Sequence, residues 1–128
     1  MPRKIPTWLI EDNETFRDVL VDGLRVTNEF IPTSFGSCEE AFEALAQGAE
    51  PPEVILLDIK LPGISGIRAI PQLKQKAPES KIIILTINED DLNIKRAMVE
   101  GADGYVVKTA GLKELFNAMR SALDGQRH

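Results

Sequence analysis

The sequence predicts an α/β fold in which helices cover both faces of a parallel, doubly wound sheet. Short apolar runs alternate with segments of helical periodicity along the whole chain, and this alternation is typical of βαβ units. The run at residues 54–58 is apolar up to its last residue, Asp58, as expected for a parallel strand buried on both faces. The 128 residues, 43% of them hydrophobic, suffice for one domain with its own core.

The first half of the chain begins with two predicted strands and the helix between them. Residues 7–10 are the first strand, and residues 13–27 follow with a helical repeat. The apolar face of that helix is formed by Phe16, Val19, Leu20, Gly23 and Leu24. Residues 29–35 are predicted to be the second strand, although Pro32 interrupts them. Because proline cannot donate to a ladder, we expect this strand at an edge of the sheet.

The middle of the chain predicts a second helix, the strand at 54–58 and a third helix. The second helix has its apolar face from Cys38 onwards and ends near Gly48. Cys38 itself is interpreted as a small core residue. The third helix runs towards Ala77, and Pro71 lies within it. We expect this proline either to kink the helix or to delay its start.

The last part of the chain continues the alternation. Residues 81–86 are a fully apolar strand with Thr86 at its end, and a fourth helix lies between Ile94 and Gly101. Residues 104–108 are predicted to be the fifth strand, and a fifth helix follows at residues 112–123.

Five βα units with right-handed crossovers predict a flavodoxin-like (βα)5 fold with strand order 2-1-3-4-5. This order places the strand containing Pro32 at an edge. Ligands of such sheets bind at the carboxyl ends of the strands, where the strand order reverses. The reversal lies between the first and third strands, so Glu11, Asp12 and Asp58 are expected to meet there.

Two further polar side chains are expected at the same edge of the sheet, Thr86 and Lys108. Three converging carboxylates would repel one another unless a cation lay between them. Mg²⁺, with Mn²⁺ as an alternative, suits carboxylate and carbonyl ligands and accepts a phosphoryl oxygen as well. Lys108 and Thr86 could contact the same phosphoryl group through an ammonium and a hydroxyl. The constellation therefore predicts phosphoryl transfer to Asp58, which as a carboxylate needs no general base.

Composition excludes several other classes of function. The net charge of −5 weighs against direct binding of nucleic acid or of an anionic membrane. The only histidine is the last residue, which argues against Ser-His or Cys-His catalysis and multi-histidine metal sites. A single cysteine agrees with a reducing compartment. No apolar run approaches the roughly 20 residues of a membrane span, and the N-terminus has no signal-peptide core.

These motifs together resemble the receiver domain of response regulators, over essentially the whole chain. The resemblance rests on Glu11-Asp12, the stretch Asp58 to Gly66, Thr86, and the stretch Gly101 to Lys108. The Gly-Ala-Asp-Gly-Tyr sequence and the Asp12-Asn13-Glu14 start are most similar to NarL/FixJ-type receivers.

The resemblance implies a role for each matching residue. Asp58 would accept a phosphoryl group, and Glu11, Asp12, Asp58 and the backbone carbonyl of Lys60 would hold Mg²⁺. Lys108 would contact the phosphoryl group. Thr86 and Tyr105 would be the switch pair, remodelling the face built from the fourth helix, fifth strand and fifth helix.

The resemblance also implies partners. We expect residues 1–128 to form one cytoplasmic receiver domain that is phosphorylated by a sensor histidine kinase, with a receiver homodimer left open. Such receivers usually precede a helix-turn-helix domain that binds DNA and controls transcription. The sequence leaves open whether this chain is truncated or stand-alone.

Three positions depart from the family pattern. Ile87 follows Thr86 where a small residue is usual, and we expect it to restrict access to the phosphoryl group. Thr109 follows Lys108 where proline is common, so a cis bond there would be a non-proline cis peptide costing about 3–4 kcal/mol. Pro71 has no counterpart that explains it.

Other functions remain open at this stage. An aspartyl-nucleophile phosphatase of the haloacid-dehalogenase type would place a second Asp where this chain has Lys60. A flavin binder would need a phosphate-binding loop where Glu11 and Asp12 lie. A receiver that never binds phosphate would not need the full set of polar residues. We expect a regulatory domain, not a conventional enzyme.

Overall fold

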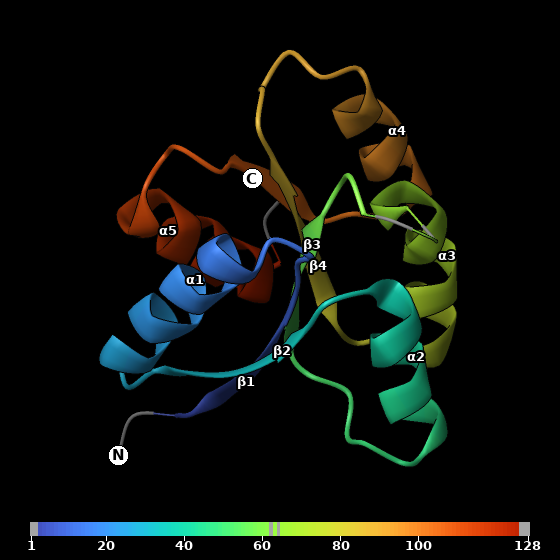
Figure 1. Cartoon of the computed structure of the whole chain (residues 1–128), viewed down its shortest axis with the longest axis horizontal. Helices are drawn as coiled ribbons and strands as arrows, with labels where there is room; N and C mark the ends of the chain where they lie inside the picture. The colour runs from blue at the N-terminus through green and yellow to red at the C-terminus, as the bar shows by residue number, and fades with distance from the viewer. Residues whose placement is uncertain (1–2, 62, 64, 126–128) are drawn as a thin grey trace.

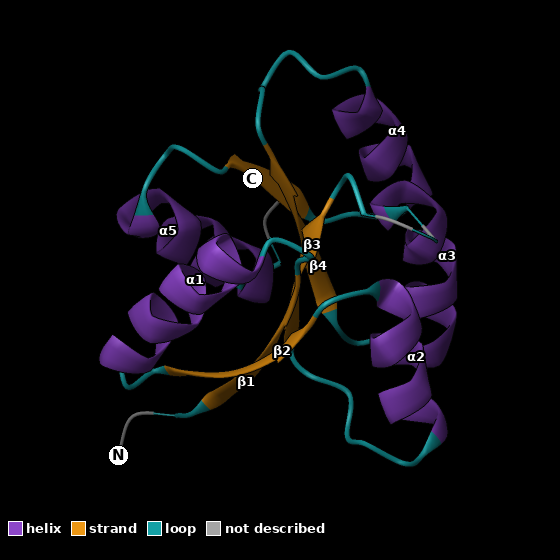
Figure 2. Ribbon diagram, in the orientation of Figure 1, coloured by secondary structure: helices purple, strands orange, loops and turns teal. Residues whose placement is uncertain are grey.

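The computed structural model describes residues 3–61, 63 and 65–125, and over these residues it confirms the predicted fold class (Figures 1 and 2). All strand pairings are parallel, and the order is β2-β1-β3-β4-β5. In chain order the elements are β1 (Ile5–Ile10), α1 (Glu14–Val26), β2 (Phe30–Phe35), α2 (Cys38–Ala46), β3 (Val54–Asp58), α3 (Gly66–Lys76), β4 (Lys81–Thr86), α4 (Asn93–Glu100), β5 (Gly104–Val107) and α5 (Leu112–Leu123). Pro62 and Ile64, from the stretch that resembles the receiver family, and His128 lie outside the described residues.

The sheet separates two apolar cores. Helices α1 and α5 cover one face, and α2, α3 and α4 cover the other (Figure 1). Along β1, Leu9 belongs to the first core with Leu24 and Met119, whereas Trp8 belongs to the second with Ile70. This division follows from the alternation of side chains along a strand. Because helices bury both faces, every residue of β3 is buried, as its apolar sequence predicts.

Pro32 lies in β2, and β2 pairs only with β1, so the predicted edge position is confirmed. A second proline, Pro6, is part of β1, which begins two residues earlier than the sequence suggested. The ladder between β1 and β3 begins at Thr7, one residue after Pro6. Pro6, which has no N–H to donate, therefore interrupts no hydrogen bond of that ladder.

The structure excludes one of the two alternatives for Pro71 and corrects one detail of α1. Pro71 does not delay α3, because the helix begins at Gly66 and continues through the proline to Lys76. The side chain of Ser65 caps this helix by accepting from the Arg68 N–H, and Pro71 itself is exposed. Val19 was assigned to the apolar face of α1, but its side chain is 57% exposed.

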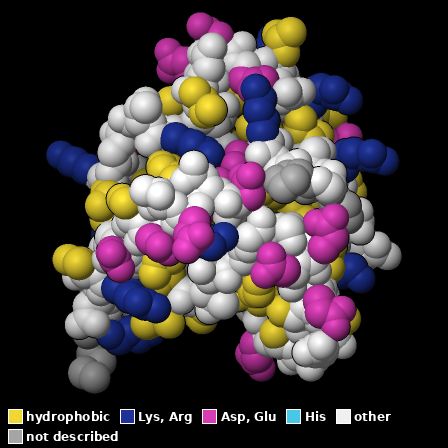
Figure 3. All heavy atoms as spheres, in the orientation of Figure 1, with side chains coloured by type: hydrophobic (Ala, Val, Ile, Leu, Met, Phe, Trp, Pro, Cys, Tyr) yellow, Lys and Arg dark blue, Asp and Glu magenta, His cyan; other side chains and the backbone are white. Residues whose placement is uncertain are grey.

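Acidic side chains lie along α1 and over α2 on the face seen in Figure 3. Glu14, Asp18 and Asp22 of α1 are all exposed. This distribution agrees with the negative net charge. Within the described residues, every helix is too short or too polar to cross a bilayer.

Candidate functional site

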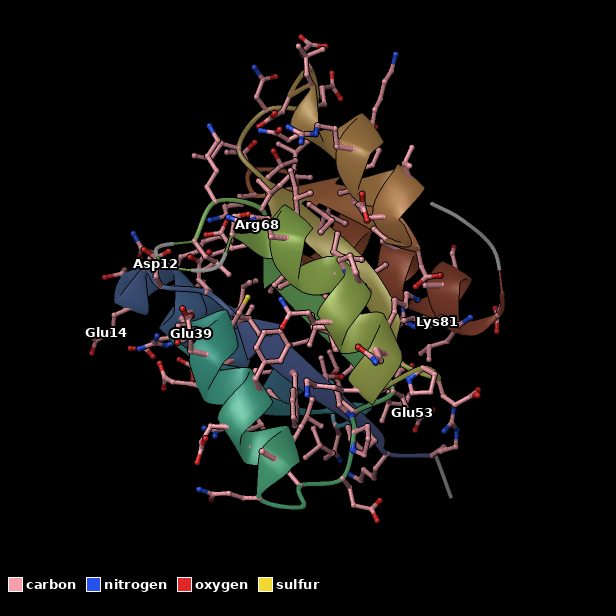
Figure 4. The ribbon with its side chains drawn as sticks, turned by 90° about the vertical axis from the view of Figure 1, so that its right-hand side faces the viewer. Asp12, Glu14, Glu39, Glu53, Arg68 and Lys81 are labelled. Atoms are coloured by element: carbon pink, nitrogen blue, oxygen red, sulfur yellow. The ribbon has the colours of Figure 1, made fainter. Side chains whose placement is uncertain are left out.

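Three carboxylates meet at the carboxyl edge of the sheet, as predicted. Glu11 and Asp12 directly follow β1, and Asp58 is the last residue of β3, its neighbour in the sheet. One carboxylate oxygen from each residue lies within 4.8 Å of the others. Glu11 is fully buried and Asp58 nearly so, whereas Asp12 is exposed. Figure 4 shows Asp12 at this edge, far from Glu53 and Lys81 at the opposite end.

Lys108, just after β5, reaches into this group of acids. Its Nζ donates to Glu11 Oε1 at 2.6 Å and to Asp58 Oδ2 at 3.1 Å. The Lys108 side chain is only 16% exposed, so both ion pairs are largely shielded from water. Residues 11, 58 and 108 are far apart in sequence, and the order of the strands brings them together.

Burial dominates the electrostatics of the Glu11 carboxyl. It raises the pKa of Glu11 above its ordinary value of 4.5, and neighbouring Asp58 raises it further, while Lys108 opposes the shift. Burial alone would lower the pKa of Lys108, but the hydrogen bonds and charges of Glu11 and Asp58 outweigh it, so this pKa is raised. One buried ammonium is therefore shared between two acids.

The connection from β3 to α3 holds the backbone around Asp58. The Lys60 N–H donates to Asp58 Oδ1 at 3.0 Å, and the Ile59 N–H donates to the Leu85 carbonyl at 3.0 Å. Gly66 begins α3 against the Asp58 carbonyl oxygen, and a Cβ at this position would collide with that oxygen. The backbone carbonyl of Lys60 was predicted to be a metal ligand, and Lys60 is among the residues that line the site.

An open pocket of about 230 Å³ surrounds these groups. The residues that line it are Glu11, Asp12, Asn13, Asp58, Ile59, Lys60, Ile87 and Lys108. Ile87 is 70% exposed, so its side chain stands at the entrance without filling a core position. Its place in the lining of the pocket that holds Asp58 is compatible with the predicted restriction of access.

Thr86, by contrast, directs its hydroxyl to the loop after β4. The Oγ1 atom donates to the Asn88 carbonyl at 3.3 Å and accepts from the Asn88 N–H at 3.4 Å. Tyr105 pairs with Ile84 in the sheet, while Thr86 pairs with Val107. Since side chains two residues apart share a face, Thr86 and Tyr105 lie on the same side of neighbouring strands.

Tyr105 is half-buried and lines a separate pocket with residues that include Glu89 and Glu114. Among the described residues, Tyr105 is thus not one of those that line the acidic pocket. Every peptide bond between described residues is trans, including the bond from Lys108 to Thr109. The non-proline cis peptide considered from the sequence is therefore not present.

Three neighbours of the site were missed or assigned only to the core. Asn13 caps α1 by accepting from the Phe16 N–H at 2.8 Å, and its own N–H donates to Glu11 Oε2 at 3.1 Å. Arg17 Nη1 donates to the Glu11 carbonyl at 3.0 Å. The Phe16 ring lies under the Lys108 ammonium, 4.9 Å from Nζ. An Asn before a helical repeat is a capping signal, but nothing local indicates the other two contacts.

The arrangement has the groups needed for metal-assisted phosphoryl transfer to a carboxylate. Three carboxylate donors with an exposed member fit a hard divalent cation such as Mg²⁺, which keeps some water ligands. Asp58 presents an ionisable oxygen to the pocket beside a buried ammonium. These groups can bind a phosphoryl oxygen and stabilise its charge as it transfers.

Comparison with known proteins agrees with this reading of the site. The family model of the response regulator receiver domain matches residues 8–120. Response regulator GacA of Pseudomonas aeruginosa is 36% identical over 97% of this chain and 58% of its own length. Transcriptional regulatory protein DegU of Brevibacillus brevis is 30% identical over 95% of the chain and 51% of its own length. The chain thus spans little more than half of these curated relatives.

Solved structures show the same architecture. Response regulator ChrA of a heme-sensing two-component system superposes with a TM-score of 0.77 and 27% identity, over 97% of this chain and 59% of that one. A LuxR-family two-component response regulator from Aurantimonas has a TM-score of 0.85 over 97% of this chain and 88% of its own. Its identity is 24%, so this likeness concerns the fold alone.

Proposed function

Because the chain belongs to the response regulator receiver domain family, we propose that Asp58 accepts a phosphoryl group from a sensor histidine kinase. As a receiver of two-component signalling, the chain is a regulatory domain and not a conventional enzyme. The observation that supports Asp58 most strongly is its contact, at 3.1 Å, with the buried Lys108 ammonium inside the carboxylate group.

In the proposed transfer, an Asp58 oxygen attacks phosphorus as the bond from phosphorus to the kinase histidine nitrogen breaks. The products are an acyl phosphate on Asp58 and a histidine without its phosphoryl group. Lys108 moves its ammonium from the carboxylate oxygens to an oxygen of the incoming group, keeping the charge compensated. Ile87, at the entrance, limits how bulky a donor can approach.

Glu11, Asp12, Asp58 and the Lys60 carbonyl are proposed to hold Mg²⁺, with Mn²⁺ as an alternative. When bound, the ion would neutralise charge on the phosphoryl oxygens. The protein side chains contribute the geometry. Buried Glu11 is held by the Asn13 N–H, and Asp12 stays exposed with room for water ligands.

The signal is proposed to pass from Thr86 to Tyr105. The two bonds of the Thr86 hydroxyl to Asn88 are long, so exchanging them for a charged phosphoryl oxygen is favourable. Movement of Thr86 vacates space on the face that it shares with Tyr105, and the surface of α4, β5 and α5 is remodelled. Thr86→Ala should accept phosphate yet lose the chemical-shift changes in β5 that beryllofluoride causes in the wild type. Exposed Thr33→Ala is the control. If beryllofluoride shifted the β5 signals of Thr86→Ala as much as those of the wild type, the coupling would be contradicted.

The proposal extends to the whole protein through the relatives. Their names, response regulator and transcriptional regulatory protein, support a transcriptional output of the NarL/FixJ type for a longer chain. DNA would then be bound through a helix-turn-helix domain beyond the residues given, in a cytoplasmic protein. The surface acids along α1 agree with a receiver that does not bind DNA itself. We also propose a receiver homodimer. Determining the molecular mass in solution with and without beryllofluoride tests it.

The decisive experiment is labelling with a small phosphodonor. Incubated with phosphoramidate and Mg²⁺, the wild type should gain one phosphoryl group by intact-mass spectrometry. It should lose the group under mild alkali, as an acyl phosphate does. Asp58→Asn should not be labelled, whereas Asp18→Asn, which removes an exposed carboxylate from α1, should react like the wild type. Labelling of Asp58→Asn would overturn the assignment.

Two alternative functions give different results. An aspartyl-nucleophile phosphatase would release phosphate continuously from small phosphomonoesters, whereas the proposed receiver turns over only its own acyl phosphate. A receiver that never binds phosphate would show no labelling and no response to beryllofluoride with Mg²⁺. Lys60, at the position where such a phosphatase would have its second Asp, weighs against the first alternative. The buried ion pairs of Lys108 with Glu11 and Asp58 weigh against the second.

A further inference from the structure

Lys108 has a third partner besides the two acids. The ring centroid of Phe16, from the first turn of α1, lies 4.9 Å from Lys108 Nζ, within the range of a cation–π contact. Phe16 is half-buried, and the Lys108 side chain is 16% exposed. An ammonium so shielded from water gains more from an aromatic face than an exposed one does.

The space beside this contact is apolar. Phe16 and Lys108 share a cavity of about 130 Å³ with side chains from β4, β5, α1 and α5. Those side chains are Val19, Leu20, Leu85, Val106, Val107, Leu112 and Leu115. The stem of Lys108 therefore runs along an apolar wall, and its charged end has only three close partners in the described structure: Glu11, Asp58 and the Phe16 ring.

The three partners differ in how they respond to the proposed reaction. A cation bound by the carboxylates would compete with Lys108 for Glu11, and phosphorylation would replace the Asp58 carboxylate. The Phe16 ring neither binds the cation nor reacts. It is thus the partner that can hold the Lys108 ammonium beside Asp58 while the ion pairs exchange.

We propose that Phe16 is a positioning residue for phosphoryl transfer, acting through a cation–π contact that keeps the Lys108 ammonium directed at Asp58. This rests on the proposed role of Asp58 as phosphoacceptor. Phe16 of α1 thereby contributes to chemistry, beyond its packing in the core between α1, α5 and the sheet. The ring does not contact the phosphoryl group itself.

The test compares three variants in labelling by phosphoramidate with Mg²⁺. Phe16→Leu keeps an apolar side chain but removes the ring, and Phe16→Tyr keeps the ring. Phe116→Leu is the matched control, because Phe116 packs against the same core and lies 5.9 Å from Arg120, away from the site. Phe16→Leu should lower the rate constant about five- to thirtyfold, or about 1 to 2 kcal/mol at about 1.4 kcal/mol per tenfold. Phe16→Tyr and Phe116→Leu should stay within about twofold of wild type, well below that cation–π range.

A double-mutant cycle separates positioning from a general loss of packing. In a Lys108→Met background, Phe16→Leu should have no further effect on the residual rate, because the ring would have no ammonium to hold. Equal losses from Phe16→Leu in both backgrounds would overturn the proposal, as would a Phe16→Tyr variant as slow as Phe16→Leu. If the wild type itself is not labelled, the role of Asp58 fails. If the wild type is labelled and Phe16→Leu is labelled at the same rate, only the role of Phe16 is contradicted.

Discussion

At the residue scale, the site depends on one buried acid whose charge is only partly compensated. Glu11 is fully buried and accepts from Lys108 and from the Asn13 N–H, but it lies close to the Asp58 carboxylate. Burying charged groups costs free energy unless they are well paired. The same arrangement that prepares a cation site therefore costs stability when no cation is bound.

This cost predicts a pH-dependent effect of Glu11→Gln in metal-free buffer. Because the pKa of Glu11 is raised in the folded state, the folded protein binds this proton more tightly than the unfolded chain. The resulting stability is fully present below about pH 4.5 and is lost as pH rises through the folded pKa. Glu11→Gln lacks this loss, so it should exceed wild type in stability near neutral pH, and the difference should vanish in acid.

Urea denaturation with EDTA at several pH values measures this difference. Exposed Glu100→Gln, at the end of α4, is the control for removing one negative charge. A stability difference between Glu11→Gln and wild type that does not change with pH would show that the Glu11 carboxylate carries no such cost.

Ile87 is the second residue whose role can be tested alone. Its exposed side chain lines the acidic pocket, so truncation to alanine widens the entrance. Ile87→Ala should raise the rates of labelling by phosphoramidate and of loss of the phosphoryl group severalfold. Leu92→Ala removes another exposed leucine-sized side chain, 80% exposed, and serves as the control. Rates equal to wild type in both reactions would eliminate a gating role for Ile87.

At the element scale, the junction of β3 and α3 fixes the position of Asp58, the proposed phosphoacceptor. β3 delivers Asp58 to the sheet edge, and α3 begins at Gly66, whose missing side chain lets the helix approach the Asp58 carbonyl. The Lys60 N–H holds the Asp58 side chain from within the loop. Residue 66 is therefore a glycine because the packing of α3 against the Asp58 carbonyl leaves no space for a side chain.

Gly66→Ala should therefore disturb both stability and the site. Its Cβ would collide with backbone, which cannot rotate away, and overpacking typically costs about 1–3 kcal/mol. We expect a loss of this size in urea denaturation, together with weaker Mg²⁺ binding. Gly36→Ala is the control, because its Cβ would meet only the ends of the Glu40 and Arg17 side chains at 3.0 and 3.2 Å. Equal stability of Gly66→Ala and wild type would refute the close approach.

At the scale of the whole molecule, the two ends of the sheet have different tasks. The carboxyl end carries the acids and Lys108, and the opposite end is fastened by Asp103. Its Oδ2 accepts from Lys74 Nζ of α3 and from the Ile82 N–H of β4, both at 2.9 Å. Asp103 thus ties α3, β4 and the start of β5 together, far from the chemistry.

Asp103→Ala should separate stability from function. Losing hydrogen bonds of a charged group should cost about 1.5–3 kcal/mol in urea denaturation, while the labelling rate stays near wild type. Arg3→Ala is the control, because it breaks the ion pair between Glu53 and Arg3, whose side chain is 65% exposed, and stability close to that of the wild type is expected. A large loss of labelling in folded Asp103→Ala would show that the two ends are coupled.

Sequence patterns predicted the fold because the periods of strands and helices are local properties. The apolar run ending at Asp58, the proline in an edge strand and the alternation of elements together determined the sheet and its order. That order in turn brought Glu11, Asp12, Asp58 and Lys108 to one edge, since parallel strands end on the same side. The sequence left the start of α3 open at Pro71, because an exposed proline can be tolerated where packing holds the rest of the helix.

The tertiary structure alone decided what each side chain of the site touches. Nothing local in the sequence could show that Lys108 bridges Glu11 and Asp58, that Thr86 is bonded to the loop, or that the Phe16 ring lies beneath the ammonium. These contacts join α1, β3, β4 and β5, and depend on the distances between packed elements. Periodicity specifies which face a residue occupies, whereas pairing and pKa depend on partners that only the folded chain brings within reach.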